Sequence, residues 1–300
     1  MTFRDRIPIF SISPQQSRLP MLGLPDTIRN NIIAVVGEFV GTFLFLFWAF
    51  VGAQIASTPV PPPEADPRLN VLVLLYISVS FAASLTANVW IFYRITGGLF
   101  NPSVALALWL VGGLPTVRCV LVIVAELVGG IAAAGIASAL LPGDLNVDTL
   151  LGGGTSIAQG VFIEMFLTAQ LVLAIIMLAV VKHKGTFLAP LGIGLSFFVT
   201  QLCGIYFTGA GLNQARSLGP AVINRRFPGY FWIYIVGPGL GALLASGFYG
   251  LMTMLHWQTS NPGQDADGLE AVILKEDPDD SKLLHQRSEV QVDNNDAQIA

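Results

Sequence analysis

The chain has 300 residues, of which 53% are hydrophobic and only 11% carry a charge. Soluble domains carry about 25% charged residues, so this composition excludes an ordinary soluble protein and predicts one that lies in lipid. The 31 glycines fit that prediction, because small residues let membrane helices approach one another closely. The formal net charge of −4 says little about the apolar part of the chain, because many of the acids lie near the C-terminus.

The chain begins with a segment, residues 1–30, that has four Arg and no apolar run of the kind a cleavable signal peptide needs. We interpret it as a cytoplasmic segment that precedes a channel domain over 31–257. A membrane-spanning helix needs about 20 mostly apolar residues. Lipid offers the backbone no hydrogen bonds, so apolar stretches of this length are predicted to be helices. Six stretches qualify: about 31–53, 70–93, 117–138, 157–181, 188–207 and 230–255.

Basic residues near the span ends set the predicted orientation, because cytoplasmic loops are enriched in Lys and Arg. They cluster in the N-terminal segment, between the second and third spans, and after the fourth span. With six spans these places share one side, so both termini are expected in the cytoplasm, although Arg225 and Arg226 oppose the trend. The C-terminal tail, 258–300, is acidic and polar and is predicted to be disordered.

Two further apolar stretches, about 101–112 and 213–224, are too short to span a membrane, and each begins at an asparagine after a Gly-rich turn. Non-helical backbone at membrane depth is tolerated only where it is buried in protein or lines a cavity. The stretches occupy matching places in two similar halves, about 31–140 and 157–257, with three spans each. A unit with an odd number of spans must insert with inverted topology, so the two short helices are expected to meet near the centre.

The residues at that meeting point predict a site for neutral solutes. Asparagine is a favoured N-cap, so Asn101 and Asn213 are expected to accept backbone N–H groups and to leave the amide free to face a pore. Pro102 suits the first helical position, where a missing N–H costs nothing. Each short helix also brings the positive end of its dipole to the centre. Two facing positive ends repel cations, protons included, while a neutral hydrogen-bonding solute can pass.

Three carboxylates lie within the apolar spans: Glu38, Glu164 and Glu126. Charged groups at membrane depth are costly and are usually paired. Glu38 and Glu164 occupy matching positions in their halves, so each is expected to accept backbone N–H groups from the short-helix loop of its own half. A proton relay or an ion site is the alternative. Glu126 is expected to be a hydrogen-bonded structural acid, and a titratable gate is the alternative.

The segments that lead into the two short helices resemble the signature loops of the major intrinsic proteins, the aquaporin family. They read Thr-Gly-Gly-Leu-Phe-Asn-Pro-Ser-Val-Ala-Leu at 96–106 and Tyr-Phe-Thr-Gly-Ala-Gly-Leu-Asn-Gln-Ala-Arg-Ser-Leu-Gly-Pro-Ala at 206–221. The resemblance covers about 31–257, and the segment 90–94 is most similar to fungal water channels. It implies an all-α membrane protein with six transmembrane helices plus two re-entrant half-helices in an inverted repeat. Exclusion of cations by opposed half-helix dipoles is established for aquaporin pores.

The resemblance also implies which residues line the pore. Its centre would comprise Asn101, Pro102, Ser103, Asn213, Gln214 and Ala215. A second constriction on the outer side, the selectivity filter, would comprise Phe81, Gln201, Ala210 and Arg216. An isolated Arg in a narrow pore repels cations and offers N–H donors to water. The family further implies a homotetramer with one pore in each subunit.

Three residues depart from the family pattern: Gln201, Gln214 and Ser103. Family members usually have His, Pro and Ala, respectively, at these positions. Gln201 keeps a hydrogen-bonding amide but cannot be protonated. Gln214 adds an N–H at the helix start, which either points toward the pore or is capped by Asn213. Glycerol-conducting members usually have Asp directly after the filter Arg, so Ser217 favours water.

The sequence therefore predicts a passive membrane channel for water, and for hydrogen peroxide as a water-like solute, that excludes protons and ions. A facilitator of glycerol or urea is one alternative, and a weakly conducting homologue with a structural or regulatory role is another. No arrangement of residues typical of a catalytic or metal site is present, so we expect no enzyme activity, cofactor, metal or nucleic-acid partner. The plasma membrane is the expected location, and an internal membrane is the alternative.

Overall fold

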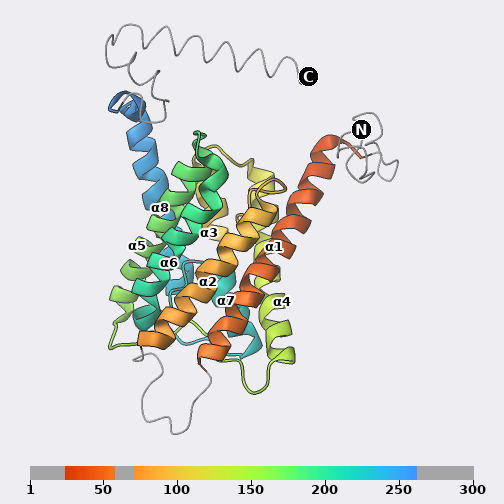
Figure 1. Cartoon of the computed structure of the whole chain (residues 1–300), viewed down its shortest axis with the longest axis vertical. Helices are drawn as coiled ribbons and strands as arrows, with labels where there is room; N and C mark the ends of the chain where they lie inside the picture. Colours follow the sequence, from red (N-terminus) through yellow and green to blue (C-terminus); the bar gives the residue numbers. More distant parts are fainter. Residues whose placement is uncertain (1–23, 58–70, 262–300) are drawn as a thin grey trace, which may run out of the picture.

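The computed structural model describes residues 24–57 and 71–261 of the chain (Figure 1). Within them, six helices are long and apolar enough to cross a membrane. These are α1 (Asp26–Ala56), α2 (Val71–Phe92), α4 (Thr116–Leu140), α5 (Ile157–Ile175), α6 (Ala189–Thr208) and α8 (Ile233–Met254). A π-helical turn, Ile176–Val180, extends α5, and a 3-10 turn, Thr186–Leu188, precedes α6. The six helices lie on the six predicted spans.

The largest difference from the predicted spans is at the start of the chain. Helix α1 begins at Asp26, inside the segment expected to precede the membrane domain. Its first turn is polar, and the Asp26 carboxylate pairs with the Arg29 guanidinium at 3.0 Å. Ion pairs three residues apart support a helix without any burial, so the helix extends beyond its apolar run. The predicted tail lies outside the described residues, except for its first four, 258–261.

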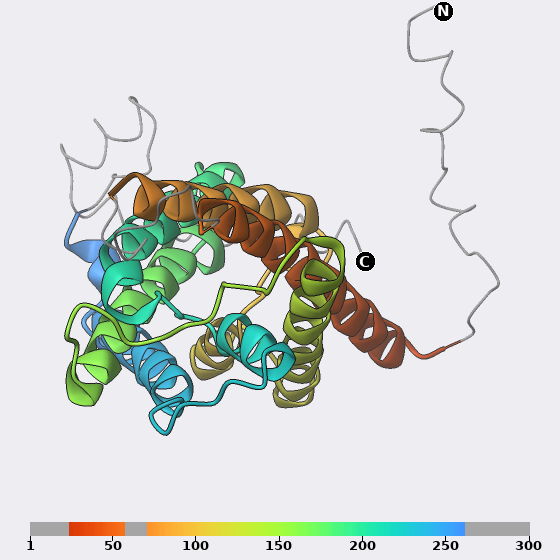
Figure 2. The same ribbon diagram turned by 90° about the horizontal axis from the view of Figure 1, so that it is seen from below.

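Two short helices lie between the long ones: α3 (Pro102–Leu110) and α7 (Gln214–Ile223). Helix α3 packs on α8, and α7 packs on α4, so each short helix contacts the last helix of the other half. In the view from below, the long helices lie around α7, which is drawn in teal (Figure 2). The short helices are therefore held inside the helical bundle, with both halves of the chain contributing to each contact.

The two halves repeat the same close contact between helices. A Cβ atom on Gly129 of α4 would lie 2.8 Å from the carbonyl oxygen of Phe39 in α1. A Cβ atom on Gly241 of α8 would lie 2.5 Å from the carbonyl oxygen of Met165 in α5. Only glycine permits this approach, which is how membrane helices pack most closely. Both carbonyls belong to the residue after a buried glutamate, so each glycine contact fixes the helix that carries that carboxylate.

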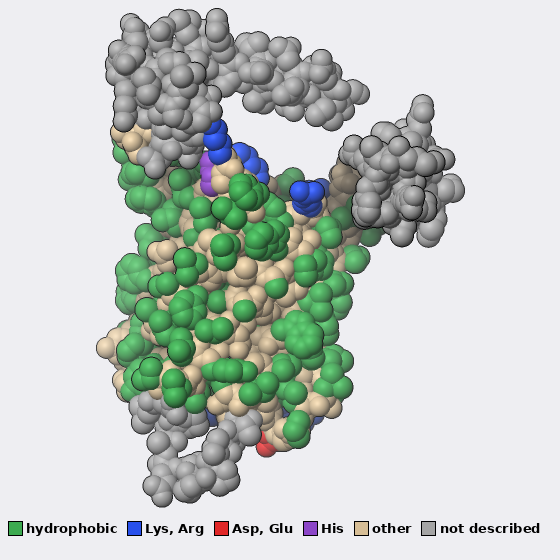
Figure 3. Space-filling model, viewed as in Figure 1, with side chains coloured by type: hydrophobic (Ala, Val, Ile, Leu, Met, Phe, Trp, Pro, Cys, Tyr) green, Lys and Arg blue, Asp and Glu red, His purple; other side chains and the backbone are tan. Residues whose placement is uncertain are grey.

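The outer surface of the bundle is apolar along its length and polar at its ends. Figure 3 shows hydrophobic side chains covering the sides of the molecule, while Lys and Arg gather at one end. That end is the one at which α1 begins and α8 ends (Figure 1). Large apolar side chains such as Val71, Leu72 and Met254 are 72%, 74% and 74% exposed. Apolar surface of this extent is suited to lipid rather than water.

Candidate functional site

The two short helices meet with their N-termini facing, and an asparagine caps each one. The Asn101 side-chain oxygen accepts from the backbone N–H of Ser103 at 2.9 Å. The Asn213 side-chain oxygen accepts from the N–H groups of Ala215 and Arg216 at 2.9 and 3.3 Å. The two caps have nearly the same backbone conformation, with φ of −156° and −155°. Two positive helix ends therefore approach each other inside the bundle.

Each capping asparagine also bonds to the opposite loop. Asn101 Nδ2 donates to the carbonyl oxygen of Leu212 at 2.9 Å, and Asn213 Nδ2 donates to that of Phe100 at 2.7 Å. An amide group has two N–H donors, so one remains on each asparagine for a solute. The expectation that the whole amide is free is corrected here, because half of its donors join the two halves of the chain.

The loops that lead into the caps are held by buried carboxylates. Glu38 accepts from the N–H groups of Leu99 and Phe100 at 3.2 and 2.9 Å. Glu164 accepts from the N–H groups of Gly211 and Leu212 at 2.9 and 2.7 Å. Both side chains are at most 1% exposed. The carboxylates thus occupy the donors that their own loops present, as the matching positions in the two halves predict.

These loops need such support because their backbone is strained. Phe100 and Leu212, which directly precede the two asparagines, have φ of 51° and 52°, and Ala210 has φ of 47°. Residues other than glycine rarely adopt this left-handed conformation, which costs about 1–3 kcal/mol at each position. The conformation turns the carbonyls of Phe100 and Leu212 toward the opposite asparagine. The strained conformation therefore places those carbonyls where they join the two loops.

Glu126 of α4 bonds at only one of its oxygens. Oε1 accepts from the backbone N–H of Asn101 at 3.0 Å. Oε2 is buried and has no hydrogen-bond partner among the described residues. Glu126 thus contacts the backbone of the loop through one oxygen.

The two residues that depart from the family pattern at the centre bond to each other. The Ser103 hydroxyl donates to Gln214 Oε1 at 3.0 Å and accepts from Gln214 Nε2 at 2.8 Å. Gln214 Nε2 also donates to the carbonyl oxygen of Ile235 in α8 at 3.3 Å. The cap oxygen of Asn213 accepts from the two residues after Gln214 and not from Gln214 itself. A polar clasp thus joins the starts of α3 and α7.

The hydrogen bonds of this clasp predict that Ser103 and Gln214 are energetically coupled, so that the effect of changing one depends on the other. Ser103→Ala leaves the buried Gln214 amide without one partner, and Gln214→Pro leaves the hydroxyl without its own. An orphaned buried polar group costs about 1–3 kcal/mol. Thermal unfolding of the purified protein in detergent should show the double variant to be more stable than the sum of the single changes predicts, by about 1 kcal/mol. Strict additivity would show that the clasp does not contribute to stability.

The four residues implied for the filter form two contacting pairs. The Arg216 guanidinium lies over the Phe81 ring, with Cζ 5.0 Å from its centroid. Gln201 Nε2 donates to the carbonyl oxygen of Ala210 at 3.2 Å. All four side chains are at most 4% exposed. Arg216 is oriented from the other side by the carbonyl oxygen of Val147, which accepts from its NH1 group at 2.7 Å.

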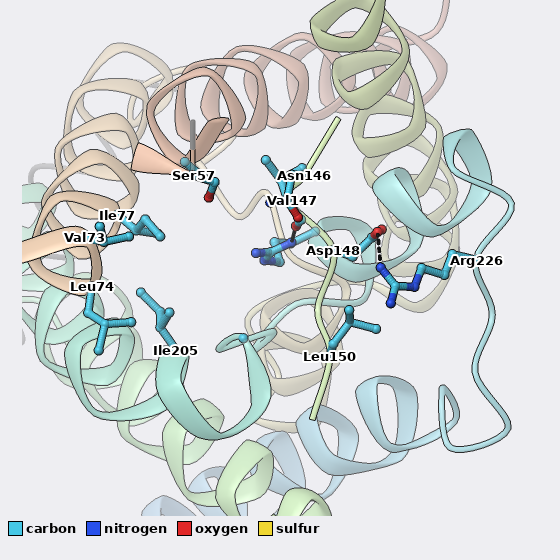
Figure 4. A pocket seen from close by; sticks show the side chains of 13 residues that line it. Ser57, Val73, Leu74, Ile77, Asn146, Val147, Asp148, Leu150, Ile205 and Arg226 are labelled. Atoms are coloured by element: carbon cyan, nitrogen blue, oxygen red, sulfur yellow. Dashed lines mark hydrogen bonds and ion pairs between the residues drawn. The ribbon is translucent and has the colours of Figure 1, made fainter. Parts of the chain in front are cut away.

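Arg216 lines a cavity of about 250 Å3, the outer cavity, at the end of the molecule where α1 ends. Leu74 and Ile77 of α2 face this cavity across from the loop that carries Val147 and Asp148 (Figure 4). Asp148 Oδ2 accepts from Asn224 Nδ2 at 2.9 Å and lies 3.8 Å from the Arg226 guanidinium.

The hydrogen bond from Asn224 holds the loop whose carbonyl orients Arg216, whereas the Arg226 side chain is exposed and its ion pair contributes little. The sequence gives no sign of this support, because a backbone carbonyl carries no residue-specific signal.

Two more cavities lie along the bundle. An inner cavity of about 350 Å3 opens near Tyr93 and Lys182, at the end where α1 begins. A central cavity of about 10 Å3 is lined by Asn101 and Asn213, and it shares Leu99 and other lining residues with the inner cavity. The paired asparagines therefore border a narrow space that adjoins the wide inner one.

The amino-acid sequence is similar to those of known proteins of one family. The family model described as "Major intrinsic protein" matches residues 27–249. The chain is 52% identical to "Aquaporin-7" of Botryotinia fuckeliana over 88% of this chain, and it spans 59% of that relative's length. It is also 52% identical to "Aquaporin-1" of Gibberella zeae over 82% of this chain and 77% of that relative.

Among solved structures, the aquaglyceroporin from Plasmodium falciparum matches with a TM-score of 0.66. The match covers 76% of this chain and 99% of that one, at 18% sequence identity. At this identity the likeness concerns the fold, and it agrees with the six long and two short helices described above.

Proposed function

The chain belongs to the major intrinsic protein family, and from this premise we propose that it is a passive channel for water that excludes protons and ions. Members of this family are channels rather than enzymes, and they pass small neutral solutes through membranes. Hydrogen peroxide is included in the proposal, because it resembles water in size and hydrogen bonding.

The observation that carries the proposal is the pair of asparagine-capped helix ends at the central cavity. Each offers one remaining amide N–H to a solute, and each brings a positive helix end to the same place. Water can accept from these donors, whereas a cation meets only positive charge. Arg216 adds a buried positive charge at the outer cavity, which a solute encounters before it reaches the asparagines.

Selectivity for water over glycerol is supported by the filter residues. Phe81, Gln201 and Ala210 are fully buried, and the Phe81 ring packs against the Arg216 guanidinium. Ser217 follows Arg216, where glycerol-conducting members usually have Asp.

The test is the volume of proteoliposomes containing the purified protein after mixing with sorbitol and then with glycerol. We expect fast shrinkage in both, and no re-swelling in glycerol beyond that of empty liposomes. Fast re-swelling in glycerol would instead indicate the neutral-solute facilitator, and shrinkage no faster than that of empty liposomes would indicate a non-conducting homologue.

The proposal extends to the cellular setting. Lys and Arg at the end where α1 begins and α8 ends support a cytoplasmic position for both termini (Figure 3). The plasma membrane is the proposed location. A homotetramer with one pore in each subunit is proposed from family membership.

A further inference from the structure

Three aromatic rings from three helices contact one another inside the bundle. They are Phe45 of α1, Phe81 of α2 and Phe197 of α6. Ring centroids lie 6.5 Å apart for Phe45 and Phe81, 5.9 Å for Phe45 and Phe197, and 6.3 Å for Phe81 and Phe197. These are contact distances for aromatic pairs. Each ring is at most 2% exposed, so the three form a closed triangle, the aromatic triad.

The aromatic triad lies between the outer and central cavities. Phe81 contacts Arg216, which lines the outer cavity. Phe45 and Phe197 line the central cavity together with Asn101 and Asn213. The outer and central cavities share no lining residue. The three rings therefore connect the residues of the outer cavity to those of the central one.

The size of the central cavity shows how narrow this part of the route is. A cavity needs about 10–15 Å3 to hold one water molecule. The central cavity has about 10 Å3, whereas the outer and inner cavities have about 250 and 350 Å3. The three rings are in mutual contact, so no opening passes between them.

We propose that Phe45 and Phe197, which pack against the filter residue Phe81, form an apolar gate in series with the filter, and that this gate limits water flow and excludes glycerol-sized solutes. The proposal rests on the proposed channel function. Water passes when a ring rotates aside, and the rings offer it no hydrogen bonds while it does so. Apolar constrictions of this kind close pores by excluding water. Two barriers in series mean that a larger solute passes only when both are widened.

The test compares Phe197→Val, Gln201→Ala and the double variant with the wild type in proteoliposomes. Phe197→Val should raise water permeability per channel about fivefold. A smaller side chain that favours the open state by about 1 kcal/mol shifts the equilibrium between closed and open states by this factor. Gln201→Ala widens only the filter, so glycerol should stay excluded. The double variant should pass glycerol. Phe45→Leu serves as a second gate variant, in case the valine variant does not fold.

Phe92→Val is the matched control, because Phe92 is a buried phenylalanine that contacts the Phe100 ring and not the aromatic triad. It should keep the water permeability of the wild type. The gate proposal fails if the wild type conducts water and Phe197→Val and Phe45→Leu conduct no faster, or if Gln201→Ala alone passes glycerol as fast as the double variant. If no variant and no wild-type sample conducts water, the proposed function itself fails.

Discussion

Replacing Arg216 by valine is expected to make the channel leak protons. Arg216 is 4% exposed, and its guanidinium donates to the carbonyl oxygen of Val147, which also lines the outer cavity. A second unit charge at about 4 Å is repelled by about 4 kcal/mol when the effective dielectric constant is about 20. The positive helix ends at the centre still oppose cations in the variant. We therefore expect proton leak to rise on the order of 100-fold, which is less than the factor that a repulsion of about 4 kcal/mol would give by itself. Decay of a pH gradient in proteoliposomes measures it.

Arg226→Val is the matched control for this prediction. Arg226 lines the same cavity, but its side chain is 59% exposed and solvent screens its charge. The control should keep the wild-type leak, and Arg216→Lys should lie between the two, because lysine keeps the charge without the planar fork. A valine variant at position 216 that holds a pH gradient as well as the wild type would show that Arg216 is not part of the cation barrier.

Glu164→Ala is expected to abolish folding. Glu164 is fully buried and accepts three hydrogen bonds: from Gly211 and Leu212, and from the Thr208 hydroxyl at 2.6 Å. Each orphaned buried donor costs about 1–3 kcal/mol, so the sum approaches the total stability of a typical domain, about 5–15 kcal/mol. Glu164→Gln can keep one acceptor oxygen and should give a folded protein of reduced stability. Yield and thermal unfolding of the purified variants measure both effects.

Glu126→Gln provides the comparison for the Glu164 variants. Glu126 is also fully buried, but only its Oε1 has a partner among the described residues. The amide oxygen can keep that bond, so thermal unfolding of Glu126→Gln should stay close to that of the wild type. If Glu126→Gln lost as much stability as Glu164→Gln, the two carboxylates would have equivalent structural roles, contrary to the hydrogen bonds described here.

Much of the fold is predictable from the sequence, because a membrane imposes strict rules on it. Apolar runs of about 20 residues have the length of a membrane-spanning helix, and the six runs fall on the six long helices. The short helices are predictable from Asn101 and Asn213, which have the residue type and the position of N-caps. The carboxylate contacts follow from the need to satisfy buried charge, since the loop of the same half offers the nearest unpaired donors.

The contacts between distant side chains and backbone are not predictable in this way. The bond between Ser103 and Gln214 joins residues 111 positions apart, and each residue taken alone looks like an isolated departure from the family. The carbonyl of Val147 carries no signal in a sequence. The aromatic triad depends on ring orientation at Phe45 and Phe197, and apolar residues within an apolar helix give no indication of which side they face.

We expect water to pass through this protein. The most direct test is the rate at which wild-type proteoliposomes shrink in sorbitol, compared with empty liposomes and with liposomes that hold an equal amount of the unfolded protein. A water channel should give fast shrinkage, with a weaker temperature dependence than that of the lipid alone, while an imposed pH gradient persists. Shrinkage at the rate of the empty liposomes would contradict it.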